Sequence, residues 1–284
     1  MTKRNFLASV ALLTALATPL AAVADALPTP PRVEVIAAPH AGSWRVTTSG
    51  SRTVVERRDG RRSWSRTFTG RFALPVVTAR GLRAGPSLDG TSIVLSTTIA
   101  SAKPASTTSF AIVSRTRIRR LELAGRWAFD AVSPDGVTVF LAESIGRNQY
   151  WIRSVDVTSG NIGERLVTKT ISYDELPGGP DGPMEGLALD RLMSPDELTA
   201  YTLYDGPSHP FVHALDTAHG GALCYDLPAK LKGVATKLWL RRGPQVGLID
   251  IVESNRVVAQ IADPTSTWGP AVLVAGTDHA PVRL

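Results

Sequence analysis

The sequence predicts an all-β protein: a single-domain β-propeller of five to six blades, with seven also compatible, that follows an N-terminal signal peptide. Beyond its first residues, the 284-residue chain has almost no helical periodicity. Short runs of Val, Ile, Thr, Leu and aromatic residues are instead bounded by Gly, Pro, Asp and Ser, which is typical of strands joined by hairpins. A unit of this kind recurs along the chain, and a repeat of about 40–45 residues with four strands indicates a propeller blade.

The N-terminus has the three parts of a secretory signal peptide. Lys3 and Arg4 precede an apolar stretch from Phe6 to about Ala22, and Ala22-Val23-Ala24 offers a small-x-small cleavage site. A membrane anchor is the alternative, but Pro19 interrupts the apolar stretch, which is also short for a span of about 20 residues. We therefore expect cleavage near Ala24 and a mature protein that is secreted or otherwise extracytoplasmic, with no membrane span.

The chain is thus expected to divide into a signal peptide at residues 1–24, a Pro-rich linker at residues 25–32 and one propeller domain at residues 33–284. The formal net charge is +6, and loss of the signal peptide leaves 29 basic against 25 acidic residues. This mild excess is spread along the chain and argues against nucleic acid as a partner. Cys224 is the only cysteine, so we expect no disulfide framework, and its apolar surroundings predict a buried side chain. We expect a monomer.

Three copies of the repeat share one order of turn, strand, hairpin, strand, turn and strand. They begin at Ser87-Leu88-Asp89-Gly90, Ser133-Pro134-Asp135-Gly136 and Ser194-Pro195-Asp196-Glu197. Pro presets φ and Asp-Gly supplies a tight turn, so the next strand starts in a fixed direction. Weaker copies span residues 43–72 and 234–274. Propellers usually close by pairing strands from the two chain ends, which predicts that Val33–Ile36 pairs with Ala271–Ala275.

On these residues the chain resembles the WD40-like propellers in which Ser-Pro-Asp-Gly starts the blade, as in TolB-type and YVTN-type proteins. Residues 133–160 and 194–227 carry the resemblance, and residues 200–204 and 209–217 look like uncharacterised exported propellers of actinobacteria. The chain departs from the pattern at Glu197, where Gly is usual. The resemblance implies the fold, but it implies no single activity, because propellers include both enzymes and scaffolds.

The common catalytic motifs are absent: the sequence has no Gly-x-Ser-x-Gly elbow, no phosphate-binding loop and no His-Glu-x-x-His. We therefore expect a non-enzymatic binding or scaffold module for a protein or cell-envelope partner, without a cofactor. A carbohydrate binder that uses exposed Trp side chains is another hypothesis, although packing between blades is the simpler interpretation of Trp64, Trp127, Trp151, Trp239 and Trp268.

A Ca²⁺-dependent lactonase or esterase is the enzymatic alternative. Glu185-Gly186-Leu187-Ala188 is similar to a stretch of the propeller lactonases, in which a Glu binds Ca²⁺ in the central channel, and this resemblance makes Glu185 a candidate metal ligand. Asp130, Asn148 and Asp190 are the candidate partners. A solvated acidic loop is the favoured interpretation of this segment, which begins near Asp174.

His209, His213, Asp216 and His219 form a second candidate metal site. On a strand that rises about 3.3 Å per residue, however, His209 and His219 would lie in turns some 20 Å apart. We therefore expect a structural role for His213 rather than a metal site.

Arg115, Arg117 and Arg119 fall on one side of a predicted strand, because side chains alternate with a period of two. Such a basic face could bind an anionic wall polymer, a phospholipid surface or an acidic partner. With Asp181 in the long acidic loop and His209, these arginines make up the candidate interaction surface. The alternative is an outer strand whose charges keep its edge from pairing.

Overall fold

The computed structural model describes residues 30–40, 42–97, 107–167, 183–245, 247–262 and 273–275. The predicted signal peptide, Asp181 and Trp268 lie outside these residues. Among the described residues, no helix is long and apolar enough to cross a membrane.

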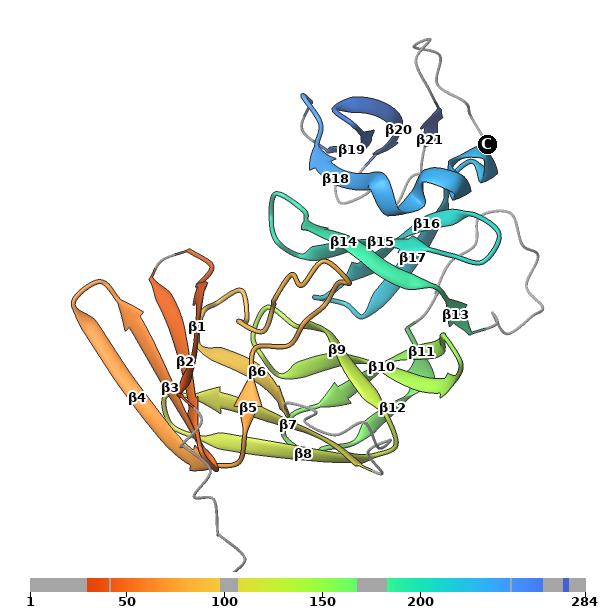
Figure 1. The fold of residues 1–284 in the computed structure, drawn as a ribbon. Coiled ribbons are helices and arrows are strands. Elements are labelled where there is room, and N and C mark those ends of the chain that lie inside the picture. The colour runs from red at the N-terminus through yellow and green to blue at the C-terminus, as the bar shows by residue number, and fades with distance from the viewer. Residues whose placement is uncertain are drawn as a thin grey trace, which may run out of the picture.

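The described chain folds into five antiparallel sheets, each with four consecutive strands in sequential order, and this arrangement confirms the predicted all-β propeller class. In Figure 1 the five sheets follow one another as the blades of an arc, with β4, β8 and β12 on its outer side. The first two blades comprise β1 (Arg32–Ala37), β2 (Ser43–Ser49), β3 (Arg52–Asp59) and β4 (Arg62–Thr69), and then β5 (Phe72–Ala73), β6 (Ser92–Thr97), β7 (Thr107–Ser114) and β8 (Ile118–Ala124). The third blade comprises β9 (Trp127–Val132), β10 (Thr138–Gly146), β11 (Gln149–Asp156) and β12 (Ile162–Leu166). The last two comprise β14 (Leu187–Met193), β15 (Thr199–Asp205), β16 (Pro210–Asp216) and β17 (Gly221–Asp226), and then β18 (Leu238–Arg242), β19 (Leu248–Glu253), β20 (Arg256–Ala262) and β21 (Leu273–Ala275).

Two short elements complete the fold. The strand β13 (Met184–Glu185) pairs with β11 beside the third blade, and the 3-10 helix η1 (Ala229–Lys237) leads into the fifth.

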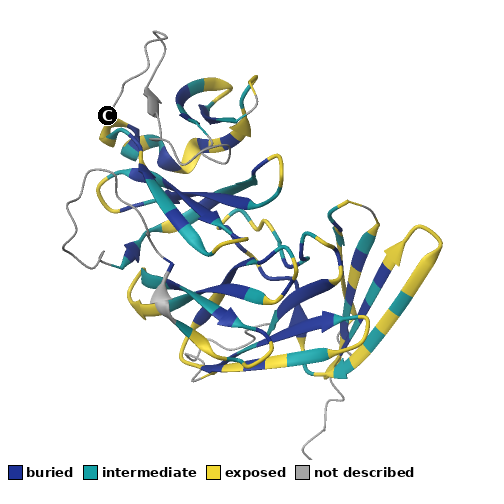
Figure 2. Ribbon diagram, turned by 180° about the vertical axis from the view of Figure 1, so that it is seen from behind, coloured by how far each residue is buried: buried dark blue, intermediate teal, exposed yellow. Residues whose placement is uncertain are grey.

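The hydrophobic core consists of four clusters, and each joins two consecutive blades. Alternating side chains supply them: in β2, Trp44 and Val46 are buried against the second blade, whereas Arg45 between them is exposed. Figure 2 shows the buried residues concentrated along the inner strands, whereas β4 is half-buried to exposed along its length. Stacking between neighbouring sheets therefore stabilises the arc.

The predicted ring closure is wrong. In the structure β1 pairs with β2 as the first strand of the first blade, and β21 pairs with β20 in the fifth. Each blade already has four strands from one stretch of chain, so none is left half-built for the other chain end to complete. Within the described residues, no core cluster joins the first blade to the fifth, and Val35 of β1 is 65% exposed.

The repeated Ser-x-Asp turns have the same hydrogen bonds in three blades. The Ser hydroxyl donates to the Asp carboxylate at 2.6 Å in Ser87–Asp89, 2.6 Å in Ser133–Asp135 and 2.5 Å in Ser194–Asp196. Each carboxylate also accepts from the backbone N–H two residues further on, at 2.9–3.1 Å. These turns join the first strand of a blade to the second, so each blade begins one strand earlier than the motif suggested.

The last residue of each turn has a left-handed backbone, with φ of 66° at Gly90, 71° at Gly136 and 60° at Glu197. An L side chain in this conformation costs about 1–2 kcal/mol. We therefore expect Glu197→Gly to raise the free energy of unfolding by about 1 kcal/mol, measured by thermal denaturation. Glu197→Ala is the matched control, since it removes the carboxylate but keeps the Cβ atom. Equal stability of the two variants would contradict the strain argument.

A hairpin at residues 74–84 interrupts the inner strand of the second blade. The Val77 N–H donates to the Leu82 carbonyl at 2.8 Å, and the Ala84 N–H donates to the Pro75 carbonyl at 3.1 Å. The inner strand resumes where Pro86 bridges to Ile93. In Figure 1 this segment, between β5 and β6, runs through the middle of the arc toward β14. We call it the central hairpin.

The central hairpin contacts blades far from its own. The Ala79 N–H donates to the Ala188 carbonyl of the fourth blade at 2.8 Å. The Arg80 guanidinium stacks on Trp239 of the fifth blade, 3.6 Å from the ring centroid, and donates to the Thr236 carbonyl at 2.7 Å. Arg83 forms a 2.8 Å ion pair with the buried Glu34 of the first blade. The hairpin thus links the two ends of the arc through its centre.

Candidate functional site

Because the strands of each blade alternate in direction, the Ser-x-Asp turns and the turns between third and fourth strands lie at the same end of the propeller. We call this end the motif face. The described residues form a hollow there between the second and third blades and another at the centre.

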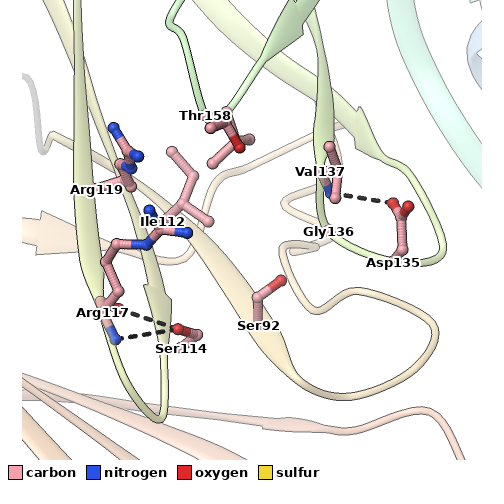
Figure 3. Close-up of a pocket in the computed structure, with 10 residues that line it drawn as sticks. Ser92, Ile112, Ser114, Arg117, Arg119, Asp135, Gly136, Val137 and Thr158 are labelled. Atoms are coloured by element: carbon pink, nitrogen blue, oxygen red, sulfur yellow. Dashed lines mark hydrogen bonds between the residues drawn. The ribbon is translucent and has the colours of Figure 1, made fainter.

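The first hollow, the inter-blade pocket, has a volume of about 140 Å³. The second blade contributes Ser92, Ile112, Arg117 and Arg119, and the third contributes Val137 and Thr158. Figure 3 shows Arg117 and Arg119 on one side of the pocket, with Ser92 and Val137 across from them. The pocket is therefore basic on one wall, with apolar side chains and hydroxyls around the rest.

The two blades approach closely at Gly136. A Cβ atom there would lie 2.1 Å from the Ser92 hydroxyl oxygen, and φ is 71°. Only glycine accommodates both the left-handed backbone and the contact. The same turn that starts β10 therefore also sets the width of the pocket.

Two carboxylates beside the pocket have a lowered pKa. The Ser133 hydroxyl and the Val137 N–H hold the pKa of Asp135 below its ordinary value of 3.8. The Ser159 N–H and hydroxyl do the same for Asp156, and Arg119 adds a weaker attraction. Both carboxylates are thus bound within their own turns.

A lowered pKa means that the carboxylate stabilises the fold above pH 3.8 and that this contribution is lost as the pH falls through the folded-state value. We expect Asp135→Asn to lower the free energy of unfolding at pH 7 by up to about 1 kcal/mol, because the group is exposed and screened. The difference from wild type should shrink at pH values below 3.8. Urea denaturation at pH 7 and pH 3 measures it, with the exposed Asp59→Asn as control, and a difference independent of pH would contradict the assignment.

The second hollow lies at the centre of the motif face and has a volume of about 330 Å³. It is mostly apolar, and four blades contribute to it: its lining includes Ile36, Pro39, Arg83, Leu88, Met193 and Glu197. Arg83 is held by Glu34 and by the Leu74 carbonyl, to which it donates at 2.7 Å.

The structure divides the predicted interaction surface between the two ends of the propeller. Arg117 and Arg119 line the inter-blade pocket, and Arg115 lies in the turn before β8, where its carbonyl accepts a hydrogen bond from Arg66. The prediction that all three arginines lie on one strand is wrong, because the Ser114 N–H donates to the Arg117 carbonyl and makes residues 114–117 a turn. His209 precedes β16 at the opposite end.

Glu185 lies beside β11, where Gln149 donates a hydrogen bond to its carboxylate. Two of its three predicted partners bind other groups. Asp130 in β9 pairs with Arg191, and Asp190 in β14 accepts the Leu240 N–H at 2.8 Å. Asn148, whose carbonyl accepts the Gly186 N–H at 3.4 Å, is the one near neighbour. In the described part of the chain, no three His, Cys, Asp or Glu side chains are grouped closely enough to hold a metal ion.

The histidines lie as the strand spacing predicted, with His209 and His219 at opposite ends of β16 and His213 buried within it. His209 bonds to Ser208 at 2.7 Å and pairs with Asp226 at 3.0 Å, whereas His219 pairs with Asp216 at 2.8 Å. Cys224, opposite His213, is half-buried rather than fully buried.

The tryptophans pack mainly between blades. Trp127 is buried, Trp44 is buried and contacts Trp64 edge-on at 5.3 Å, and the half-exposed Trp239 is stacked against Arg80. This favours packing over a platform for sugars.

Ser92 and Thr158 were not predicted to be pocket residues. Ser92 stands five residues after the Ser of a Ser-x-Asp turn, and Thr158 stands at the turn between a third and a fourth strand. The positions of Ser92 and Thr158 within the repeat therefore predict that both lie at the motif face. Which two blades form a pocket between them depends on tertiary packing.

A scan against protein-family models and a search of curated proteins gave no match to this chain. Solved structures do match. One is TolB from Acinetobacter baumannii, with 12% identity, coverage of 78% of this chain and 52% of that chain, and a TM-score of 0.39. Another is a putative TolB from Agrobacterium tumefaciens, with 12% identity, coverage of 86% and 76%, and a TM-score of 0.42.

The propeller domain of the Trilobed protease from Pyrococcus furiosus also matches, with 10% identity, coverage of 86% of both chains and a TM-score of 0.37. The chain spans about half the length of the Acinetobacter TolB chain. Such low identities concern the fold alone. With five four-stranded blades among its described residues, the chain is a β-propeller, and TolB-type propellers are among the solved structures to which it is similar.

Proposed function

We propose that this protein is an exported, non-enzymatic binding module that presents its motif face to an anionic protein or cell-envelope partner. The observation that carries the proposal is the concentration of exposed arginines on the motif-face turns of the first two blades. They are Arg58, Arg61, Arg62, Arg115 and Arg117. Complementary charge of this kind speeds association and selects partners, and its effect falls as salt rises.

The centre of the molecule supports binding at an end rather than within the channel. The central hairpin occupies the middle of the arc, with bonds to Ala188, Thr236 and Glu34. A ligand would therefore meet the motif face and its two hollows. Asp59 is the one acidic residue in the first-blade turn, so that turn remains basic overall.

The binding test uses sedimentation of the mature chain with purified cell walls that retain their anionic polymers, at 50 and 500 mM NaCl. We expect binding at low salt that falls at high salt. The double substitution Arg61→Glu and Arg115→Glu should weaken it at least fivefold. The matched control, Arg52→Glu with Arg147→Glu, makes the same charge change at the opposite end and should bind within twofold of wild type. Equal loss in both variants, or no binding by wild type, would overturn the proposal.

Export is tested separately. Residues 1–24 fused to a reporter that folds only outside the cytoplasm should give a signal, and Leu12→Arg with Leu13→Arg in the apolar stretch should abolish it. A reporter that stays inactive with the unaltered segment would remove the extracytoplasmic part of the proposal.

A further inference from the structure

The inter-blade pocket contains a buried donor without an acceptor. The Arg119 Nε atom is inaccessible to solvent and has no hydrogen-bond partner among the described residues. Buried polar groups without a partner are rare in native structures. Arg119 lines the pocket, so its guanidinium group can donate to a ligand there through the Nη atoms, whereas the covered Nε atom faces away from the pocket opening.

A second guanidinium stands on the same wall. Arg117 lies in the turn before β8, exposed, and its backbone N–H and carbonyl bond to Ser114, which fixes the turn. Figure 3 shows the Arg117 and Arg119 side chains beside one another, with Ile112 between them and the rest of the pocket. Within the described residues neither guanidinium forms an ion pair.

The nearby carboxylates do not replace a ligand. Asp135 lines the pocket, but its Oδ1 atom accepts from the Ser133 hydroxyl at 2.6 Å and from the Val137 N–H at 3.0 Å. Asp156 attracts Arg119 at a distance, but its Oδ1 atom accepts from the Ser159 N–H and hydroxyl at 2.6 and 2.8 Å. These carboxylates reduce the positive electrostatic potential of the pocket, but they do not pair with the guanidinium groups.

Two hydroxyl groups also line the pocket. The Ser92 hydroxyl of β6 donates to the Ser87 hydroxyl at 3.2 Å, whereas Thr158 lies in the turn after β11. A planar carboxylate has two oxygens, which can accept hydrogen bonds from the two guanidinium groups. A tetrahedral phosphate has further oxygens that can also accept from the Thr158 hydroxyl. A volume of about 140 Å³ admits one such group with its ester link, and the pocket is open, so the rest of a larger ligand can extend into solvent.

We propose that the pocket between the second and third blades binds a single phosphate group, with Arg117 and Arg119 as its cationic wall. The proposal deepens the proposed function and rests on it for the source of the phosphate, which is a phosphodiester of an anionic envelope polymer. Free phosphate or a small phosphomonoester has the same chemistry, and the experiment separates these sources.

The test is calorimetric titration of the mature protein with inorganic phosphate, glycerol 3-phosphate and poly(glycerol phosphate) at constant ionic strength, with acetate as the carboxylate control. We expect wild type to bind phosphate and Arg119→Gln to bind it at least tenfold more weakly. The affinity of wild type for acetate should be at least tenfold lower than its affinity for phosphate. Arg147→Gln removes the same charge at the opposite end of the propeller and should bind within twofold of wild type. Thr158→Val, which leaves both arginines in place, should weaken phosphate binding about threefold.

Circular dichroism verifies that each variant is folded. Phosphate binding that is absent in wild type, or equal in wild type and Arg119→Gln, would overturn the pocket assignment. If wild type binds phosphate but neither the polymer nor cell walls, the phosphate pocket is supported and the envelope polymer is excluded as its partner. If the double variant Arg117→Gln with Arg119→Gln binds cell walls as wild type does, the protein is still a binding module, but the pocket is not its binding site.

Discussion

Asp130→Ala should lower the free energy of unfolding by about 3–5 kcal/mol, because it leaves a buried guanidinium without its partner. The Asp130 and Arg191 side chains are each 6% exposed and form an ion pair between the third and fourth blades. Arg191 also donates to the Thr202 hydroxyl at 2.8 Å, which fixes its position in the blade interface. Urea denaturation followed by circular dichroism measures the loss.

The control is the double variant Asp130→Ala with Arg191→Met, which removes both charges and keeps an apolar side chain of similar length. It should recover part of the loss, because a buried pair contributes less than the penalty for breaking it. A single variant within 1 kcal/mol of wild type would show that water reaches Arg191 and would contradict the burial argument.

Glu34→Ala should lower the free energy of unfolding by about 2–3 kcal/mol, because three donors lose a buried carboxylate. The Glu34 side chain is 8% exposed and pairs with Arg32 at 2.7 Å and Arg83 at 2.8 Å. It also accepts the Leu74 N–H at 2.7 Å, at the point where the central hairpin leaves the second blade. We therefore expect faster amide hydrogen exchange in residues 74–84 and in β18, which the hairpin reaches through Arg80 and Trp239.

Glu34→Gln is the matched control, since its amide oxygen still accepts the Leu74 N–H while the charge is lost. It should be destabilised by less than Glu34→Ala, and its hairpin should stay protected from exchange. Faster exchange confined to β1 in Glu34→Ala would mean that the hairpin does not depend on this carboxylate.

The blades could be predicted because their signals are local. Ser133-Pro134-Asp135-Gly136 determines a turn from four neighbouring residues, and β10 and β11 follow it as runs rich in apolar and aromatic residues. Glu197, which stands where the repeat usually has Gly, adopts the left-handed backbone that Gly has in the other two turns. The turn conformation could therefore be predicted there from the neighbouring residues as well.

The rest depends on contacts between distant parts of the chain. Residues 74–84 carry Pro, Arg and Gly and look like an ordinary loop, and only the positions of Ala188 and Trp239 make them a central element. The arginine pattern at 115–119 suggested one strand face, but the strand begins at Ile118. The pocket could not be predicted for the same reason, because it needs the second and third blades side by side.

Each blade is built from one unbroken stretch of chain, and this feature bears on how such a protein can change over evolutionary time. In a propeller whose first and last strands pair within one blade, gene duplication or deletion of a blade must preserve that pairing between the two chain ends. Here a duplicated segment such as residues 127–166 carries all four of its strands with it. Insertion of such a unit would lengthen the arc without disturbing any existing strand pairing.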